Sequence, residues 1–125
     1  MGPFQMAERH ERYHDQHLDL DFERKIAVLD TKPLGLTRKE YDLLALLIQN
    51  AGEVVTRETL LLRVWGYSNQ IRTRTLDVHI RRLRKKLGEH SGVYIETIFS
   101  VGYRFQPFRA PRTAQRLAPV MALGA

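Results

Sequence analysis

The segment from about Arg74 to Leu87 constrains the fold most, because its apolar and basic residues separate onto opposite sides of a helix. At 100° per residue, four apolar residues fall within about 60° of one another. These residues are Leu76, Ile80, Leu83 and Leu87. Gly88 follows them and is a typical helix stop. The spacing therefore predicts a helix that buries a narrow apolar stripe and presents its other side outward.

The outward side of this predicted helix is strongly basic. From Arg72 to Lys86 the sequence has seven basic residues and one acidic residue, Asp77. Phosphates relieve the repulsion within such a helix and release condensed counterions when they bind. Arginine can bond both acceptors of a guanine edge, and the DNA major groove admits a helix. The pattern favours double-stranded DNA as the partner, and a basic helix docked on an acidic protein is the alternative.

The positive charge is concentrated in the second half of the chain. Residues 1–64 carry nine basic and eleven acidic groups, whereas residues 65–125 carry eleven basic and three acidic groups. A chain of 125 residues is long enough for one domain with its own core. There is no cysteine for a disulfide or a cysteine-based zinc site, and no apolar run of about 18 residues. We expect no cofactor, no metal, no membrane contact and a cytoplasmic location.

The periodicity divides the chain into a domain and two ends. Residues 18–36 alternate apolar and polar residues in short bursts, which predicts two or three short antiparallel strands. Residues 1–17 are polar and lack periodicity, so we predict a disordered leader, a linker or a tag remnant. Residues 106–125 show no convincing amphipathic pattern and are predicted to be a flexible tail. The folded domain is therefore expected to cover residues 18–105.

Two further helices and a hairpin complete the predicted domain. Thr37–Glu40 forms a capping-box sequence, and the inward residues after it are Leu43, Leu44, Leu47 and Ile48, with Gly52 as the stop. A second helix is expected after Thr56, with Leu60, Leu61 and Val64 inward and a break at Trp65-Gly66. Val93–Ile98 and Tyr103–Phe105 are strand-like, and the residues between them predict a β-hairpin.

These elements and their motifs resemble, from about Leu18 to Phe105, the C-terminal DNA-binding domain of OmpR/PhoB-type bacterial response regulators. The motifs are Leu36-Thr37-x-x-Glu40-Tyr41-x-Leu43-Leu44, Gly52-x-Val54-Val55-x-Arg57-x-x-Leu60, Val64-Trp65-Gly66, Arg74-Thr75-Leu76-Asp77-Val78-His79-Ile80-x-x-Leu83-Arg84-x-Lys86-Leu87, and Thr97 with Gly102-Tyr103-Arg104-Phe105. The resemblance implies an α+β winged helix-turn-helix with an N-terminal four-stranded antiparallel sheet, three helices and a C-terminal hairpin wing. It also implies sequence-specific DNA binding for transcription regulation in a two-component system, and no enzymatic activity.

The resemblance further implies roles for individual residues. The third helix would lie in the major groove, with Arg82 as the leading base reader beside Val78 and Arg81. Contacts to the DNA backbone would come from Trp65, Arg74, Thr75, His79, Arg84, Lys85 and Thr97. The wing residues would be Phe99, Ser100 and Arg104. The segment expected to touch RNA polymerase is Gly66, Tyr67, Ser68, Asn69, Gln70, Ile71, Arg72 and Thr73.

The wing tip departs from the family pattern. The family commonly has Arg-Gly where this chain has Phe99-Ser100, and arginine is the usual probe of narrow A·T-rich minor grooves. Phenylalanine supplies no charge, so we expect weakened wing readout, with Arg104 compensating partly at most.

The resemblance also implies partners. Such proteins normally carry an N-terminal receiver domain, which is absent from these residues, so we expect an excised effector domain or a stand-alone regulator. Tandem direct repeats of DNA are the expected target, bound by a monomer or weak dimer.

Alternatives remain for the whole chain and for single residues. A protein-interaction module would present the basic helix to an acidic protein surface. A small nuclease would use Asp77 and His79, but these residues diverge by about 200° on a helix. Asp77 is expected to pair with a nearby arginine, and the indole of Trp65 can equally serve the DNA backbone or the core.

Overall fold

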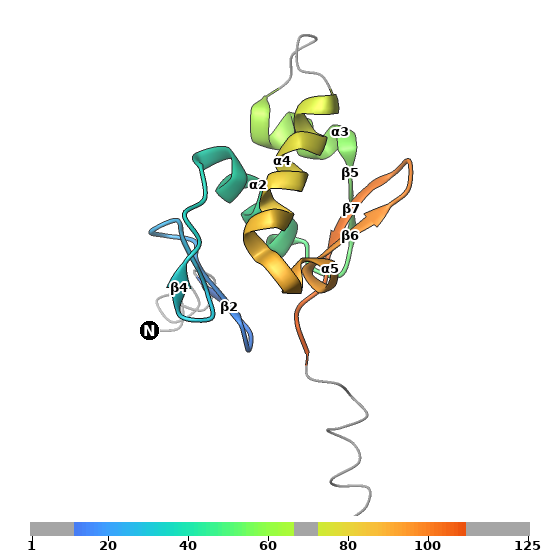
Figure 1. Ribbon diagram of the computed structural model, residues 1–125. Helices are drawn as coiled ribbons and strands as arrows, with labels where there is room; N and C mark the ends of the chain where they lie inside the picture. The colour runs from blue at the N-terminus through green and yellow to red at the C-terminus, as the bar shows by residue number, and fades with distance from the viewer. Residues whose placement is uncertain (1–11, 67–72, 110–125) are drawn as a thin grey trace, which may run out of the picture.

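A computed structural model describes residues 12–66 and 73–109 of the chain (Figure 1). The strands are β1 (Arg12–His14), β2 (Leu18–Asp21), β3 (Ile26–Leu29), β4 (Lys32–Pro33), β5 (Val54–Thr56), β6 (Ile95–Ile98) and β7 (Gly102–Phe105). The helical segments are α2 (Arg38–Gln49), α3 (Arg57–Leu60), η1 (Leu61–Trp65), α4 (Thr73–Leu87), η2 (Gly88–His90) and α5 (Ser91–Tyr94). Among the helices of these two ranges, none has the length and apolar character needed to cross a membrane.

The N-terminal sheet has the strand order β1-β2-β3-β4, and all neighbouring strands are antiparallel. Leu18 and Leu20 of β2 are fully buried on the same face, as their alternation predicts. Strand β1 lies inside the segment predicted to be a disordered leader. Tyr13 pairs with Leu20 and packs edge-on against Phe105, with ring centroids 5.5 Å apart. The expectation of disorder therefore fails for residues 12–17, because a three-residue strand with one apolar side chain has no recognisable period.

Helix α2 begins with the predicted capping box. Thr37 Oγ1 accepts a hydrogen bond from the Glu40 N–H at 3.2 Å, and Glu40 Oε1 accepts one from the Thr37 N–H at 3.0 Å. The helix ends at Gln49, and Gly52 follows with a φ of 87°. The inward residues are all buried, namely Leu43, Leu44, Leu47 and Ile48.

The second predicted helix forms as two short consecutive segments. The Thr56 side chain caps α3 by accepting a hydrogen bond from the Thr59 N–H at 3.1 Å. The chain then continues through η1, a single π-helical turn, with Val64 buried and Trp65 half-buried. Gly66 stops the segment with a φ of 86°, at the predicted break.

Helix α4 is the element that the apolar stripe predicted. Its inward residues are 0–2% exposed, and they are Leu76, Ile80, Leu83 and Leu87. Burying a side chain of this size stabilises a fold by about 1.5–3 kcal/mol, so this stripe anchors the helix firmly. Helix α4 packs across α2 in the middle of the molecule (Figure 1).

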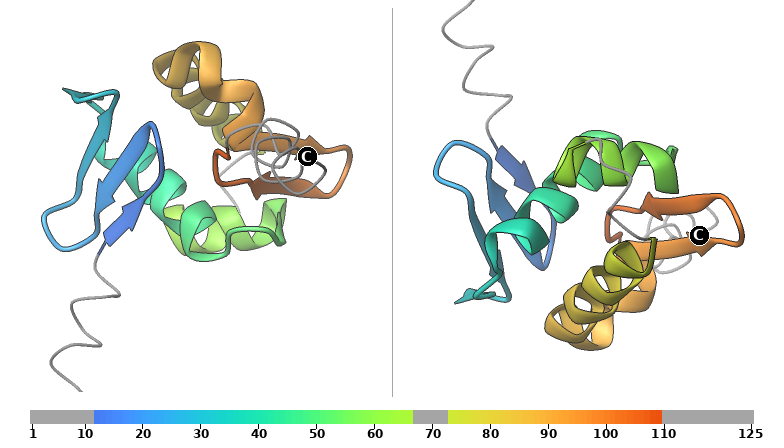
Figure 2. Two further views of the ribbon diagram at one scale, coloured as in Figure 1. Left: turned by 90° about the horizontal axis from the view of Figure 1, so that it is seen from below. Right: turned by 90° about the horizontal axis from the view of Figure 1, so that it is seen from above.

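A second sheet has the order β5-β7-β6 and includes the predicted hairpin. The hairpin is shorter than predicted, because Val93 and Tyr94 belong to α5 and strand β6 begins at Ile95. Tyr94 is fully buried and stacks on Phe105, with ring centroids 5.5 Å apart. Two further views show this hairpin and the N-terminal sheet on opposite sides of the helices (Figure 2).

The residues after β7 return to the N-terminal sheet. The Phe108 N–H donates a hydrogen bond to Asp15 Oδ2 at 3.1 Å, and the Tyr94 hydroxyl donates one to Asp15 Oδ1 at 2.7 Å. The flexible tail predicted from residue 106 therefore does not describe residues 106–109. Residues 110–125, predicted to continue that tail, lie outside the described residues.

Candidate nucleic-acid interface

Helix α4 presents the predicted base-reading residues on the side opposite its buried stripe. Arg81 and Arg82 are exposed, and Val78 is half-buried between neighbouring turns. Arg74, one turn earlier, is also exposed. A shallow depression on this face is lined by Arg74, Asp77, Val78 and Arg81. The structure thus gathers the residues expected to read bases onto one accessible, basic surface.

Asp77 lies at the edge of this surface and joins three elements. The Arg57 guanidinium of α3 contacts both Asp77 carboxylate oxygens, at 2.9 and 3.0 Å. The Tyr103 hydroxyl of β7 donates a hydrogen bond to Asp77 Oδ1 at 2.9 Å. The hydrogen bond from Arg57 is the main cause that holds the pKa of Asp77 below its usual value. The expected pairing with an arginine is confirmed, and the partner is Arg57 of α3.

Arg84 connects α4 to the hairpin. Its guanidinium donates hydrogen bonds to the Ile95 carbonyl at 2.9 Å and to Thr97 Oγ1 at 2.7 Å. It also lies over the Tyr103 ring, 5.8 Å from the ring centroid. Two residues expected to contact DNA phosphates, Arg84 and Thr97, are therefore hydrogen-bonded to each other.

Trp65 and His79 pack together beside α4. Their rings meet edge-on with centroids 4.9 Å apart, and His79 Nδ1 lies 2.8 Å from the Thr75 carbonyl oxygen. That contact fits an Nδ1–H donor and directs the Nε2 edge of the ring away from the helix backbone. His79 and Asp77, the pair considered for a nuclease, engage different neighbours.

Lys86 and Lys85 are adjacent in sequence but occupy different environments. Lys86 Nζ lies 2.6 Å from Glu40 Oε1 and donates a hydrogen bond to the Gly35 carbonyl at 3.1 Å. Burial opposes ionisation of Glu40, but the contacts from Lys86 and Thr37 outweigh it and lower the Glu40 pKa. Lys85, expected to contact the DNA backbone, is exposed.

The hairpin of β6 and β7, called the wing below, has an apolar tip. Phe99 is 88% exposed, and Ser100 adopts a positive φ of 65° in the turn. Arg104 pairs across the two strands with Glu96, at 2.8 and 2.9 Å, so its charge is directed to a protein carboxylate. Of the segment expected to touch RNA polymerase, residues 67–72 lie outside the described residues.

The sequence pattern assigned no role to Arg57 or Glu96, which both hold residues of the candidate interface. Arg57 of α3 holds Asp77 of α4, and Glu96 holds Arg104 across the β6–β7 hairpin. Arg57 falls within one of the quoted motifs, which was the available signal, but a motif does not name a partner. The pairing of Glu96 with Arg104 follows from the hairpin register, because the two residues face each other directly.

A family model and several known proteins match this chain. The family described as "Transcriptional regulatory protein, C terminal" matches residues 31–105. The uncharacterized transcriptional regulatory protein YclJ of Bacillus subtilis is 48% identical over 79 residues, which are 62% of this chain and 35% of that protein. The chain thus spans about a third of the length of this curated relative.

Two solved structures have closely similar folds. The response regulator DrrB of Thermotoga maritima, an OmpR/PhoB homolog, is 34% identical with a TM-score of 0.72, over 82% of this chain and 48% of that one. The Klebsiella pneumoniae RstA DNA-binding domain, in complex with the RstA box, is 30% identical with a TM-score of 0.70, over 79% of this chain and 100% of that one.

Proposed function

Because this chain belongs to the family of OmpR/PhoB-type transcriptional regulatory C-terminal domains, we propose that it binds specific double-stranded DNA sequences as the output domain of a two-component response regulator. The observation that carries the proposal is the exposed basic face of α4, held in place by a fully buried apolar stripe. The relative that was solved with its DNA box has the same fold and supports the same partner.

In this proposal α4 enters the major groove as the recognition helix. Arg82 is the leading base reader, and Arg81 lies beside it on the same exposed face. Each guanidinium can bond the O6 and N7 atoms of a guanine at once. Val78 lies half-buried between the arginines and supplies an apolar contact for a thymine methyl group. These three side chains would therefore contact base edges and would not rely on phosphate charge alone.

The neighbouring residues would set the position of the helix on the duplex. Arg74 and Lys85 lie on the outward face of α4, and Thr75 is half-buried beside it. These three residues would contact phosphates. His79 would use its Nε2 edge, since Nδ1 is engaged by a backbone carbonyl, and Trp65 would contribute its indole N–H beside it. Arg84 and Thr97 would act mainly by fixing the wing against α4, because they are bonded to each other.

The wing would lie along an adjacent minor groove. Phe99 offers apolar contact to sugars at the tip, whereas Arg104 is held by Glu96 at the base of the hairpin. We therefore propose that the wing adds little charge-based minor-groove reading. The base specificity of this chain would then rest largely on α4.

The proposal includes further partners of the whole regulator. One recognition helix makes few base contacts, so tandem direct repeats about one helical turn apart are the proposed target. Residues 66–73 are the proposed contact with RNA polymerase. The chain alone is proposed to bind as a monomer or weak dimer.

The test is selection of bound duplexes from a random pool, followed by affinity measurements against salt for Arg82→Ala and Arg24→Ala. Arg24 is the matched control, because it is an equally charged, exposed side chain in the turn between β2 and β3 of the N-terminal sheet. Loss of a bidentate guanine contact is expected to weaken specific binding by about 1–3 kcal/mol, roughly 5–150-fold, and to relax one base position. The Arg24 variant should select the same motif with nearly unchanged affinity.

Two results would contradict the proposal. Selection of no motif beyond A·T content, with a steep salt dependence, would indicate binding to phosphates alone. An Arg82 variant that binds the selected duplex like the parent would contradict the assignment of Arg82 as the leading base reader.

A further inference from the structure

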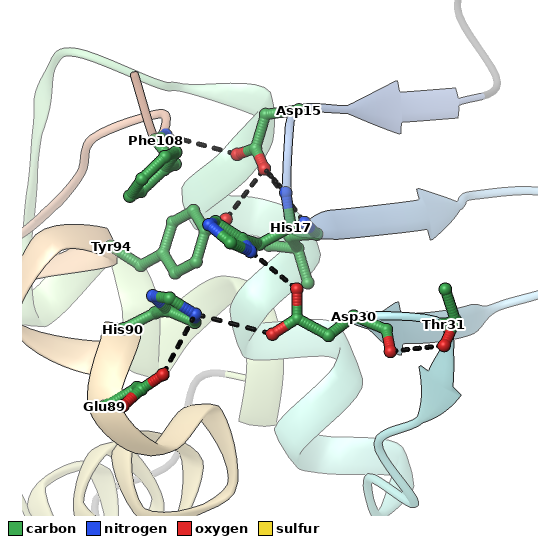
Figure 3. A network of polar contacts seen from close by, with 9 residues as sticks. Asp15, His17, Asp30, Thr31, Glu89, His90, Tyr94 and Phe108 are labelled. Carbon is green, nitrogen blue, oxygen red and sulfur yellow. Dashed lines mark hydrogen bonds and ion pairs between the residues drawn. The ribbon is translucent and has the colours of Figure 1, made fainter. Parts of the chain in front are cut away.

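Two histidines from opposite ends of the domain meet at one carboxylate, away from the DNA-binding face. His17 Nδ1 lies 2.5 Å from Asp30 Oδ1, and His90 Nε2 lies 3.4 Å from Asp30 Oδ2. Figure 3 shows both imidazole rings turned toward this carboxylate. The three ligand atoms all lie within 4.8 Å of one another. Neither histidine takes part in the proposed DNA interface.

Three different elements bring these side chains together. His17 precedes β2, and its carbonyl accepts a hydrogen bond from the Asp30 N–H at 2.8 Å. Asp30 is the first residue of a two-residue turn between β3 and β4, where Asp30 and Thr31 both have positive φ, 49° and 70°. His90 is the last residue of η2, directly after α4. The cluster therefore joins the N-terminal sheet to the end of the recognition helix.

The donor set is suited to a transition-metal ion. Two imidazole nitrogens and one carboxylate oxygen form a common three-ligand set for zinc, and the chain has no cysteine that would compete. We propose that His17, Asp30 and His90 form a binding site for a divalent transition-metal ion, with Zn²⁺ as the reference ion. The fourth position is open to water or to Glu89, whose Oε2 lies 3.8 Å from His90 Nε2. Calcium and magnesium prefer oxygen-only sites and are poor candidates.

The site is partly prepared for an ion. The His17 and His90 side chains are 21% and 15% exposed, and their rings stack with centroids 4.0 Å apart. The Phe108 ring packs against both, with centroids at 4.4 and 5.8 Å. Partial burial and the Phe108 contacts limit the positions that both rings can take. The carboxylate of Asp30 is half-exposed, which gives an ion access from solvent.

Binding requires a small local rearrangement. A tetrahedral ion at about 2.0–2.1 Å from each ligand separates the ligand atoms by roughly 3.4 Å. The His17–Asp30 contact must therefore open by roughly 0.9 Å, and the rings must rotate out of their stack so that both lone pairs point at the ion. The ion then takes the place of the direct contacts between each imidazole nitrogen and Asp30. Such rotations move side chains only, and the exposed carboxylate can follow.

An ion bound here would cross-link two parts of the folded domain. It would connect the β2–β3 end of the sheet with the segment after α4, so it would bind the folded state and not the unfolded chain. Thermal stability should rise by on the order of 10 °C at a hundredfold excess of ion over its Kd. Val78, Arg81 and Arg82 lie two to three turns earlier on α4, so DNA affinity should change little.

The experiment titrates chelator-treated protein with ZnCl₂, by calorimetry and by thermal unfolding, and with CoCl₂ by visible absorption. We expect one Zn²⁺ per chain, a higher unfolding temperature and the absorption bands of four-coordinate Co²⁺. His17→Gln and His90→Gln should weaken binding by more than the roughly 10–100-fold that loss of an outer-shell partner costs. His14→Gln is the matched control, because His14 is exposed and faces a single carboxylate, Asp19, at 3.4 Å.

Folding of each variant is checked by its unfolding temperature without metal, and Asp30→Asn, which preserves side-chain shape, provides a second test of the same site. The proposal is overturned if the parent shows no one-to-one binding. It is equally overturned if folded His17, His90 and Asp30 variants bind Zn²⁺ like the parent, or if binding is lost only in the His14 variant.

Discussion

Replacing Lys86 by methionine is expected to destabilise the domain by about 2–3 kcal/mol, whereas the same change at Lys85 should leave stability nearly unchanged. The two lysines are adjacent on α4 and have the same intrinsic helix propensity. Lys86 reaches the carboxylate of Glu40, which is 2% exposed, and the carbonyl of Gly35. Lys85 is directed to solvent. Their substitution therefore separates a structural cation from a cation available to DNA.

The magnitude follows from the burial of the pair. Breaking a buried ion pair by removing one partner costs about 3–5 kcal/mol, because the other charge stays buried. The Lys86 side chain is 32% exposed, so water partly compensates Glu40 in the variant and the lower estimate applies. Thr37 continues to donate its N–H to Glu40, which limits the loss further. A double variant with Glu40→Gln removes the stranded charge, and it should be more stable than Lys86→Met alone.

The assay pairs urea unfolding with DNA binding measured by fluorescence anisotropy at several salt concentrations. Lys85→Met should lower the salt slope by about one, the value for one lost phosphate contact. Lys86→Met should leave that slope nearly unchanged at temperatures where the variant is folded. Equal stability of the two variants would refute the assignment of Lys86 to the core, and so would a double variant less stable than Lys86→Met.

Three further predictions concern the wing and its attachment. Phe99→Arg should tighten DNA binding and steepen its salt dependence, because it restores a cation at an exposed tip; unchanged binding in the anisotropy assay would contradict the expectation of a weakened wing. Gly102→Ala should destabilise the domain by about 1–3 kcal/mol or more, since a Cβ there would lie 2.0 Å from the Val55 carbonyl oxygen, and urea unfolding checks it. Asp77→Asn should lower stability at neutral pH. Arg57 holds the pKa of Asp77 below its usual 3.8, so the difference in unfolding free energy between parent and variant should persist above about pH 5 and shrink as the pH falls below 3.8. Unfolding at pH 7 and at pH 3 measures this difference. A difference independent of pH would exclude the ionised carboxylate as its cause.

The elements with strong local signals could be predicted from the sequence. The α4 stripe, the Thr37 capping box and the stop at Gly66 depend on residues within a few positions of one another. Strand β1 and helix α5 were missed for the opposite reason. Strand β1 exists because Tyr13 packs on Phe105, and α5 because Tyr94 is buried on the same ring, so tertiary contacts decide both.

The site residues could be predicted by type and face, but their partners could not. A helical period places Arg81 and Arg82 on the outward side of α4 and leaves Arg84 and Lys86 at its flanks. It does not show that Arg84 meets the β6 strand or that Lys86 meets α2. Those contacts depend on how α4 crosses its neighbours, and the crossing is set by the complete core. The cluster of His17, Asp30 and His90 was invisible for the same reason, since 73 positions separate its histidines.

Helix α4 should make fewer phosphate contacts than its number of basic residues suggests. A count of seven cations from Arg72 to Lys86 would imply up to seven phosphate contacts and a salt slope near −6 for duplex DNA. Among the described residues of this segment, Arg84 and Lys86 instead hydrogen-bond to protein oxygens and hold the wing and α2 against the helix. If Arg82 and Arg81 read bases, the phosphate contacts from this helix are fewer still. A modest salt slope with strong sequence selectivity is therefore the signature that this arrangement of arginines implies.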